Sequence, residues 1–510
     1  MTMATCNAAS EFVDRHLAEG RAAKVAFVDG AGTLTYGDLA EQCGRMASLL
    51  AASAIPRESR IALLLLDTSD FPVAFWGAIK AGVVPVALNT LLTTEQYAYV
   101  LADSRARALV VSAALLPVVE PIFGTLPFLT HVFVSGGPTP PFARDLAAEL
   151  RAHPPTAATA PTSPDETAFW LYSSGSTGMP KGVRHVHTSL IETARLYGDG
   201  VLGIREDDVV FSAAKLFFAY GLGNGMTFPM SVGATAVLLA TRPTPEEVFA
   251  TLGAHRPTIF FGVPTLYAAM LAHAAADPAL SLPGLRACVS AGEALPAEVG
   301  HAWKRRFGVD ILDGVGSTEM LHIYVSNRPG DIRYGTSGKP VPGYRIRLVG
   351  DDGAAVPDGE VGEMLVSGPS AAEGYWNQRE KSRRTFEGEW MRTGDKYVRD
   401  ADGWYTYQGR TDDMFKVSGI WVSPFEVESA LVSHPAVLEA AVVPNEDADG
   451  LLKPRAVVVL KPGQKPDGLV PALQEHVKAT AGPWKYPRWI DFADNLPKTA
   501  TGKIQRFRLR

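Results

Sequence analysis

One stretch of small and hydroxylated residues has the composition of a phosphate-binding loop. It reads Ser173-Ser174-Gly175-Ser176-Thr177-Gly178-Met179-Pro180-Lys181-Gly182. Glycines let backbone N–H groups approach an anion closely, the hydroxyls add neutral donors, and Lys181 adds a positive charge. Pro180 stands where the GxxxxGK[ST] pattern requires its second glycine, so a P-loop NTPase is disfavoured. We therefore expect this loop to bind phosphate groups by another arrangement.

The elements that must position this loop are short apolar runs that alternate with helix-like stretches. The first unit comprises residues 60–66, 70–81 and 83–87, and further apolar runs follow at 108–111, 168–172, 258–261 and 285–290. This alternation predicts an α/β fold with largely buried strands. The run at 168–172 directly precedes the loop, so the loop should begin at a strand end. Residues 151–165, rich in Pro, Ala and Thr, predict an exposed connector.

Composition limits the class of protein. The chain has 510 residues, of which 46% are hydrophobic and 20% charged, as in a globular chain of two or more domains. The net charge of −6 arises from interspersed acidic and basic residues, which disfavours nucleic acid and membrane surfaces as partners. Residues 1–15 lack a signal-peptide pattern, and the scattered Cys6, Cys43 and Cys288 fit a reducing cytoplasm.

The sequence pattern changes near Gly409. From there the apolar runs recur at shorter intervals, charged residues are more frequent, and basic residues cluster at 498–510. We predict a boundary at residues 409–413, which gives an N-terminal domain of residues 1–409 and a C-terminal domain of residues 410–510.

Four further motifs follow in order along the chain. They are GVGSTE at residues 314–319, RTGD at 392–395, GRTDD at 409–413 and PKTATGK at 497–503. Together with residues 172–182 they resemble the signatures of the adenylate-forming superfamily, which contains acyl- and aryl-CoA ligases, firefly luciferase and the adenylation domains of peptide synthetases. The resemblance covers nearly the whole chain. It implies a large N-terminal α/β domain of several subdomains and a small, mobile C-terminal α+β domain.

The resemblance implies a reaction in which a carboxylate attacks the α-phosphate of ATP and expels pyrophosphate. A carboxylate with a pKa near ~4 is ionised at pH 7, so the reaction needs charge neutralisation and alignment more than a general base. By resemblance, Glu319 coordinates Mg²⁺, Thr318 hydrogen-bonds the α-phosphate, and Lys503 bridges the carboxylate and phosphate oxygens. The implied cofactors are ATP, Mg²⁺ and coenzyme A.

Other positions match the nucleotide site of the family. Asp395 matches an aspartate that accepts both ribose hydroxyls, and Arg410 is placed to reach the ribose or a phosphate. The implied walls of the adenine site are Gly292, Glu293 and Ala294 on one side and Asp313 and Gly314 on the other. An ordinary strand end and turn would also explain these wall residues.

The C-terminal domain of the family works in two orientations, and Asp412 matches its hinge. The rotation withdraws Lys503 and brings residues 416–421 to the active site, where Lys416 and Gly419 would line the tunnel for the coenzyme A thiol. Relatives of this type are regulated at the catalytic lysine, so Lys503 is also a candidate target of a lysine acetyltransferase.

An aromatic and glycine-rich segment, KLFFAYGLGN at residues 215–224, is expected to form one side of the acid pocket. Residues 211–240 contain no Asp or Glu, so an amino acid substrate, whose ammonium would need a buried carboxylate, is disfavoured. This segment, SAGEALP at 290–296, GSTEMLHI at 316–323 and VSGIWVSPFEVE at 417–428 resemble benzoate-CoA ligases. The resemblance implies that the aryl ring is bordered by Ala219, Tyr220, Gly314, His322 and Ile323.

The sequence therefore favours ATP-dependent ligation of benzoate, or a simple substituted benzoate, to coenzyme A by a monomer or homodimer. The alternative is a CoA ligase for another small or medium-chain acid, such as a cinnamate or a fatty acid. A regulatory module that binds a nucleotide without turnover is disfavoured because Lys503, Glu319 and Asp395 are all present.

Three residues that could suggest other chemistry have plainer explanations. His185 and His187 are two positions apart with no acidic or cysteine partner nearby, so we expect them to be structural. Cys288 lies in an apolar run without a recognisable base, and we expect it to belong to a strand core.

Overall fold

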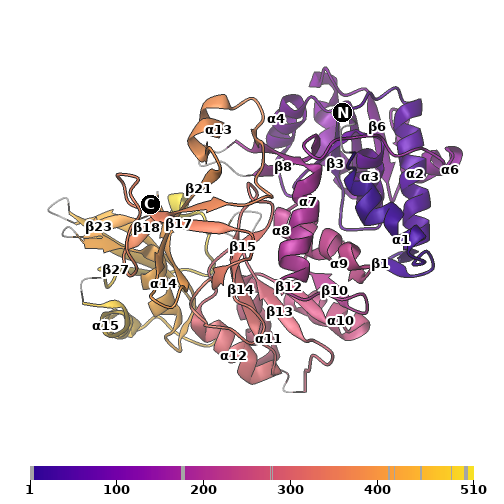
Figure 1. Cartoon of the computed structure of the whole chain (residues 1–510). Helices are drawn as coiled ribbons and strands as arrows, with labels where there is room; N and C mark the ends of the chain where they lie inside the picture. Colours follow the sequence, from indigo (N-terminus) through magenta and orange to yellow (C-terminus); the bar gives the residue numbers. More distant parts are fainter. Residues whose placement is uncertain are drawn as a thin grey trace.

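The computed structural model describes residues 5–173, 179–275, 277, 279–411, 414–417, 420–447, 451–483, 485–498 and 504–509. Two large sheets make up most of the N-terminal part, a smaller antiparallel sheet follows, and the C-terminal residues form a separate unit at the left of Figure 1.

The first large sheet has eight strands in the order β19-β9-β8-β4-β3-β5-β6-β7. Its strands from β8 to β7 run parallel, whereas β9 and β19 are antiparallel additions at one edge. The strands are β3 (Arg60–Leu64), β4 (Val84–Ala87), β5 (Ala108–Ser112), β6 (His131–Ser135), β7 (Arg144–Asp145), β8 (Thr167–Ser173), β9 (Lys181–Val186) and β19 (Gly374–Tyr375).

Helices cover both faces of this sheet because successive strand residues point to opposite sides. Ile61 and Leu63 pack with α2 and α3, and Ala62 and Leu64 pack with α4 and α5. The covering helices are α2 (Tyr36–Ala52), α3 (Asp70–Lys80), α4 (Thr94–Ser104) and α5 (Leu116–Val119). Near-continuous apolar strands are therefore required here, as the sequence pattern predicted.

The second large sheet has nine strands in the order β16-β15-β14-β13-β12-β10-β11-β1-β2, and β1, β11, β10, β12, β13 and β14 run parallel. The strands are β1 (Val25–Asp29), β2 (Gly32–Thr35), β10 (Val209–Ser212), β11 (Thr235–Val237), β12 (Ile259–Gly262), β13 (Ala287–Ser290), β14 (Ile311–Gly316), β15 (Ile323–Ser326) and β16 (Lys339–Pro340).

Helices pack on both faces of this second sheet as well. One face is covered by α10 (Pro245–His255), α11 (Pro264–Ala275) and α12 (Ala297–Phe307). The other face meets a helical layer that the two large sheets share, consisting of α7 (His187–Thr193), η4 (Ala194–Asp199), α8 (Ala219–Leu222), η5 (Gly223–Thr227) and α9 (Phe228–Val232).

A five-stranded antiparallel sheet joins the large sheets to the C-terminal unit. Its strands are β17 (Arg345–Val349), β18 (Val361–Ser367), β20 (Phe386–Glu387), β21 (Trp390–Arg399) and β22 (Tyr405–Arg410). Between β18 and β20 the chain contributes β19 to the first sheet and then forms the short helix α13 (Arg379–Thr385). This excursion places α13 against β19, which pairs with β9.

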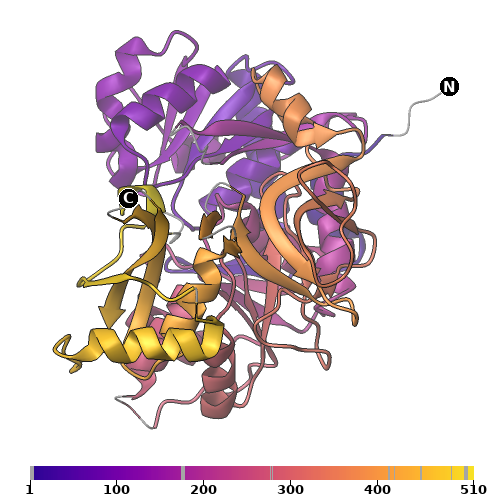
Figure 2. The same ribbon diagram turned by 90° about the vertical axis from the view of Figure 1, so that its left-hand side faces the viewer.

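The C-terminal unit has its own apolar core, formed by helices packed on a three-stranded sheet. Its elements are β23 (Phe415–Val417), β24 (Ile420–Val422), α14 (Pro424–Val432), β25 (Val437–Glu446), β26 (Leu452–Leu460), α15 (Leu469–Ala481) and β27 (Trp489–Phe492). Helix α14 contacts β22, with the rings of Tyr407 and Phe425 5.3 Å apart. Figure 2 shows this unit, in yellow, beside the N-terminal part.

The structure confirms the α/β fold, and each predicted apolar run contains a strand. The prediction of an exposed connector at residues 151–165 was wrong at Thr162, whereas the other residues of this segment are exposed or partly exposed. Thr162 is buried, and Ala160 N–H donates to the Lys80 carbonyl at 2.7 Å, because the segment packs across α2 and α3. Strand β22 ends at Arg410, inside the predicted boundary region. No described helix has the length and apolarity needed to cross a membrane.

Candidate active site

The two ends of the predicted phosphate loop are set by an antiparallel pair of strands. Ser173, the last residue of β8, stands opposite Lys181, the first residue of β9. The Ser173 hydroxyl is buried and has no hydrogen-bond partner within the described residues, so it is available to a ligand oxygen. The central loop residues Ser174, Gly175, Ser176, Thr177 and Gly178 lie outside the described part of the chain.

Three side chains from separate segments meet beside this loop. Lys181 Nζ lies 2.9 Å from Glu319 Oε1, and both side chains are 13% exposed. The hydroxyl of Tyr375 in β19 accepts from Lys181 Nζ at 2.7 Å and donates to Glu319 Oε1 at 2.9 Å. The Lys181 ammonium also lies 4.1 Å from the centre of the Tyr375 ring. We call these three residues the Lys181–Glu319–Tyr375 cluster.

The cluster keeps Glu319 ionised. Burial by itself raises the pKa of the Glu319 carboxyl, but the charge and hydrogen bond of Lys181 and the hydroxyl of Tyr375 together hold that pKa below its ordinary value. A buried carboxylate that stays charged, next to the ends of the predicted phosphate loop, suits a hard divalent cation shared with phosphate oxygens.

A buried histidine supports the motif that contains Glu319. His185 Nε2 lies 2.8 Å from the Thr318 carbonyl oxygen, so the ring donates a proton to that carbonyl. Burial lowers the pKa of His185 to about 4, which keeps the ring neutral at pH 7. The neighbouring His187 accepts from the Ala8 N–H at 3.2 Å. No group of three metal-ligating side chains occurs within the described residues.

The predicted adenine walls lie at the ends of two neighbouring strands. Ser290 of β13 stands opposite Asp313 of β14, so the segments after them are side by side. Gly292 adopts φ +94°, a left-handed conformation that favours glycine, and it is exposed. Glu293 and Ala294 are partly exposed. The Asp313 side chain is buried, accepts from the Leu295 N–H at 3.4 Å, and has a pKa raised well above its usual range by burial.

The predicted ribose residues are paired with each other across two strands. Asp395 of β21 stands opposite Arg410 of β22, and Arg410 Nη1 lies 3.0 Å from Asp395 Oδ1. Arg410 also donates to the Thr393 carbonyl at 3.1 Å. The charges of both Glu319 and Arg410 act on the Tyr375 hydroxyl, which indicates that the Asp395–Arg410 pair is near the Lys181–Glu319–Tyr375 cluster.

The expected acid pocket is reached from the carboxyl ends of β12 and β13. Tyr220, in α8, donates from its hydroxyl to the carbonyls of Gly262 and Val289, each at 3.2 Å. These bonds fix the phenol ring at the strand ends. Ala219, at the start of α8, is buried beside it.

His322 forms a second wall and meets Tyr220 directly. Its Nε2 lies 3.0 Å from Asn224 Oδ1 and 3.3 Å from the Tyr220 carbonyl oxygen, so Nε2 carries a proton. The ring also packs on Tyr197, Tyr220 and Phe228, with centroids 5.2, 5.5 and 4.5 Å away. Burial lowers the pKa of His322 to about 3, so the wall is neutral at pH 7.

Glycines make room for these side chains. A Cβ at Gly223 would lie 2.5 Å from His322 Cδ2, and a Cβ at Gly314 would lie 2.9 Å from Ile323 Cγ2. Both distances are shorter than side-chain contacts allow, so the positions of His322 and Ile323 depend on these glycines. Ile323 itself is buried at the start of β15.

The residues predicted in the C-terminal domain are only partly described. Lys416 lies in β23, which pairs with β24. Asp412, Gly419 and Lys503 lie outside the described residues. The motif that ends in Lys503 begins inside them, where Lys498 Nζ lies 2.6 Å from Glu439 Oε1.

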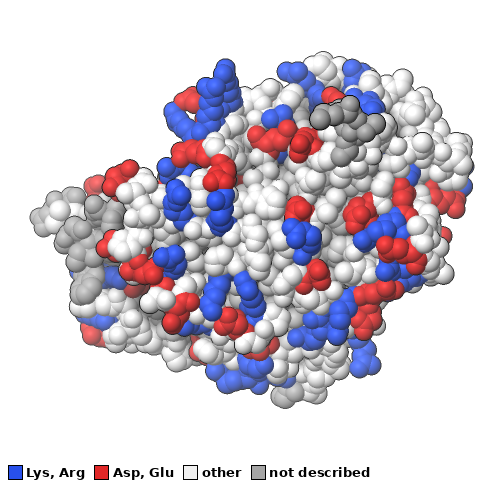
Figure 3. Space-filling view, in the orientation of Figure 1, with Lys and Arg blue, Asp and Glu red and all other residues white. Residues whose placement is uncertain are grey.

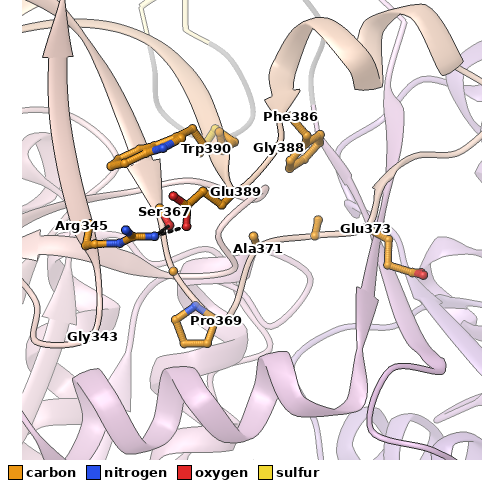
Figure 4. A pocket seen from close by; sticks show the side chains of 13 residues that line it. Gly343, Arg345, Ser367, Pro369, Ala371, Glu373, Phe386, Gly388, Glu389 and Trp390 are labelled. Carbon is orange, nitrogen blue, oxygen red and sulfur yellow. Dashed lines mark hydrogen bonds and ion pairs between the residues drawn. The ribbon is translucent and has the colours of Figure 1, made fainter. Parts of the chain in front are cut away.

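A separate cavity of about 470 Å³ lies between the five-stranded sheet and residues 367–373. Figure 4 shows Arg345 and Glu389 joined on one wall, with Trp390 above them and Phe386 across the opening. None of the residues predicted for the nucleotide or the acid lines this cavity. We therefore assign neither substrate to it.

The contacts of four residues in this region were not predicted from the sequence: Tyr375, His185, Tyr197 and Asn224. Tyr375 links Lys181 to Glu319 from 56 positions beyond Glu319, and His185 reaches Thr318 across 133 positions. Asn224 lies in the segment proposed for the acid pocket, but nothing in that segment indicated that it holds His322. Cys288 is fully buried in β13, as predicted, and burial raises the pKa of its thiol to about 12.

Comparison with known proteins gives matches along nearly the whole chain. The family of AMP-binding enzymes matches residues 14–376, and the family of AMP-binding enzyme C-terminal domains matches residues 426–503. A 4-hydroxybenzoate-CoA/benzoate-CoA ligase of Rhodopseudomonas palustris (strain ATCC BAA-98 / CGA009) is 57% identical over 515 residues, covering 100% of this chain and 95% of the relative. A benzoate-CoA ligase of Thauera aromatica is 58% identical over 507 residues, covering 99% and 95%.

Solved structures of CoA ligases are also similar over nearly the whole chain. A crystal structure of the anthranilate CoA ligase AuaEII in complex with anthranoyl-AMP superposes with a TM-score of 0.96 at 44% identity, covering 99% of this chain and 97% of that chain. A benzoate CoA ligase from Burkholderia xenovorans LB400 superposes with a TM-score of 0.92 at 53% identity, covering 99% and 100%.

Proposed function

The chain belongs to the family of AMP-binding enzymes, and we propose that within this family it is a benzoate-CoA ligase. It joins benzoate, or a simple substituted benzoate, to coenzyme A in two steps. In the first, a benzoate oxygen attacks the α-phosphorus of ATP, and pyrophosphate leaves with the electron pair of the broken P–O bond. In the second, the thiol of coenzyme A attacks the carbonyl carbon of the benzoyl adenylate, and AMP leaves.

The observation that supports this proposal most strongly is that one short segment contributes both to the cluster beside the predicted phosphate loop and to the predicted acid pocket. Glu319 belongs to the Lys181–Glu319–Tyr375 cluster beside the phosphate loop, and His322, three residues later, packs on Tyr220 in a neutral, aromatic-walled region. A flat, uncharged ring bound at His322 would hold its carboxylate near the α-phosphate. A neutral wall also favours a benzoate over an acid that bears a second charge.

Glu319 fits the magnesium ion that this reaction uses, because its carboxylate is buried, charged and close to the loop ends. When bound, the ion neutralises charge on the phosphates. Lys181, which neutralises Glu319 in this structure, is then available to phosphate oxygens. Thr318, whose carbonyl His185 holds, would present its hydroxyl to the α-phosphate.

The nucleoside would lie between the strand ends and the Asp395–Arg410 pair. The two oxygens of Asp395 can accept from both ribose hydroxyls, and Arg410 pairs with this carboxylate at 3.0 Å. Gly292, Glu293 and Ala294 on one side and Gly314 on the other would border the adenine. Asp313 is buried, so we expect it to act through its backbone and by fixing Leu295.

We expect the C-terminal domain to use two orientations, with Asp412 as the hinge between residues 1–409 and 410–510. In one orientation Lys503 bridges the benzoate and phosphate oxygens. In the other, Lys416 and Gly419 line the path of the thiol. Lys503 is a candidate target of a lysine acetyltransferase, and the intact mass of the Lys503 peptide from native protein tests this.

A substrate panel tests the proposed function. Pyrophosphate release is measured with benzoate, hydroxybenzoates, aminobenzoates, cinnamate and a medium-chain fatty acid, with and without coenzyme A. We expect benzoate or a substituted benzoate to give the highest kcat/KM. A fatty acid or cinnamate with the highest kcat/KM would contradict the benzoate assignment and favour the alternative CoA ligase.

A further inference from the structure

Helix α13 contacts β19, and the hydroxyl of Ser382 joins the two elements. The Ser382 hydroxyl accepts from the Tyr375 N–H at 2.9 Å and lies 2.9 Å from the Gln378 carbonyl oxygen. Tyr375 in turn stands opposite Val183 of β9, two residues after Lys181. The residue before Ser382 is Lys381, so its position relative to Lys181 is fixed by the backbone of two paired strands and one helix turn.

The Lys381 ammonium lies within the electrostatic reach of the Lys181–Glu319–Tyr375 cluster. Its side chain is half-buried, and the charges of both Lys181 and Glu319 act on it. The nearby carboxylates are already engaged, since Glu319 pairs with Lys181, and Glu380, the single acidic residue of α13, pairs with Arg384. One buried carboxylate therefore pairs with Lys181 and also acts electrostatically on the ammonium of Lys381.

Such an excess of positive charge is unfavourable unless an anion joins it. Figure 3 shows Lys and Arg gathered on the projection that α13 forms, at the top of the molecule. Lys381 and Lys181 thus come from different elements, and both interact electrostatically with Glu319. A triphosphate placed across the loop ends would supply the missing negative charge.

The direction in which pyrophosphate leaves determines which phosphate groups lie near Lys381. In an in-line displacement the acid and the pyrophosphate lie on opposite sides of the α-phosphorus. The acid pocket is built on α8 and the segment that contains His322, whereas α13 contacts β19, β20 and β21. The pyrophosphate therefore points away from His322, toward Lys181 and α13.

On the basis of the proposed function, we propose that Lys381 is a binding residue for the β- and γ-phosphates of ATP and stabilises the departing pyrophosphate. As the bond between the α-phosphorus and its bridging oxygen breaks, the electron pair moves onto pyrophosphate, and Lys381 neutralises part of that charge. The carboxylate oxygen becomes the new ligand of phosphorus. Lys381 takes no part in thiol transfer, because no pyrophosphate is present in that step.

The test compares Lys381→Met and Lys381→Arg with Arg384→Met. Arg384 is a matched control on the same helix, and its side chain is 78% exposed. Benzoate-dependent ATP–pyrophosphate exchange gives the KM for pyrophosphate, and calorimetry of the full chain with magnesium pyrophosphate gives its Kd. We expect Lys381→Met to raise both values about tenfold, as for loss of one charged hydrogen bond. Lys381→Arg should stay within about threefold of wild type, because the charge is kept.

Thiol transfer from supplied benzoyl-AMP to coenzyme A serves as the internal control for folding, and all three variants should retain it. The proposal is overturned if Lys381→Met leaves both pyrophosphate values unchanged, if Arg384→Met raises them equally, or if Lys381→Arg loses as much as Lys381→Met. If an acid other than benzoate drives exchange, the same comparison is run with that acid. In that case the benzoate assignment fails while the role of Lys381 is still tested.

Discussion

Lys181 Nζ lies 2.9 Å from Glu319 Oε1, and the hydroxyl of Tyr375 bonds to both. Lys181 comes from β9, Tyr375 from β19 and Glu319 from the turn after β14, so the cluster joins three chain segments. The two large sheets meet at this point, because β9 and β19 belong to the first and β14 to the second. The proposed phosphate site therefore lies where the two large sheets meet.

Replacing Tyr375 by Phe should weaken the use of ATP. The change removes the hydroxyl that bonds to Lys181 and Glu319 but keeps the ring under the ammonium. Loss of one hydrogen bond to a charged group costs about 1.5 kcal/mol, so kcat/KM for ATP should fall about tenfold. Tyr334→Phe is the matched control, because its hydroxyl donates to Asp310 at the same 2.9 Å away from the site. An equal fall in both variants would contradict the specific role of Tyr375.

A methyl group at Gly223 should alter the acid pocket. The added Cβ would lie 2.5 Å from His322 Cδ2 and 2.9 Å from Phe228 Cζ, so the imidazole must move. We expect Gly223→Ala to lower kcat/KM for benzoate at least about tenfold while KM for ATP changes little. Gly225→Ala, in the same π-helical turn, meets the end of Leu216 at 3.1 Å and Ser212 Cβ at 3.8 Å, and it should be milder. If both variants bind benzoate like the wild type, His322 does not border the ring.

Replacing Lys503 by Ala should separate the two half-reactions. We expect benzoyl-AMP formation to fall by at least about a hundredfold, because a charge that acts in the transition state is lost. Transfer from supplied benzoyl-AMP to coenzyme A should remain largely intact, since the proposed two-orientation scheme withdraws Lys503 for that step. Single-turnover assays measure both steps. Equal loss in both steps would refute the two-orientation scheme.

Acid should destabilise the fold through its buried histidines. Burial lowers the pKa of His16, His185 and His187 to about 4 and that of His322 to about 3. An unfolded histidine has a pKa of about 6.5, so between about pH 6.5 and 4 the unfolded chain binds more protons than the folded chain. The free energy of unfolding therefore falls as the pH drops through this window, and it is insensitive to these groups above about pH 7.5.

The measurement is the pH dependence of urea unfolding, compared between wild type and His322→Gln. Each fully buried histidine contributes a slope of at most about 1.4 kcal/mol per pH unit. His322→Gln removes one titrating group, while an amide N–H can still donate to Asn224. The slope of the unfolding free energy against pH should therefore be smaller in this variant by the contribution of one histidine. A slope that is identical in the two proteins would show that His322 titrates normally.

The sequence predicted those features that depend on residue type and local spacing. The loop that contains Lys181 follows an apolar run, and the strand and turn needed to present it are recognisable from periodicity and glycine content alone. The order of the motifs then indicated which distant segments share a site. The α/β fold follows from the periodicity, and the family assignment from the resemblance of the five motifs to the adenylate-forming superfamily.

Contacts between distant segments could not be predicted in this way. Tyr375 belongs to a strand of two residues, too short for any periodicity, and it reaches Glu319 only because β19 pairs with β9. His185 was expected to be structural, but its spacing from His187 gives no sign that it holds the Thr318 carbonyl. Likewise the exposed-connector prediction failed at Thr162, because polar composition does not reveal which helices a segment will pack against.

The most direct test of the proposed benzoyl-adenylate intermediate follows an oxygen atom of benzoate into the products. Benzoate labelled with oxygen-18 in its carboxylate is incubated with ATP, magnesium and coenzyme A, and the products are examined by mass spectrometry. If benzoate attacks the α-phosphorus, the products are benzoyl-CoA, pyrophosphate and AMP, and each AMP gains one labelled oxygen. Unlabelled AMP, or ADP with labelled phosphate, would contradict an adenylate intermediate.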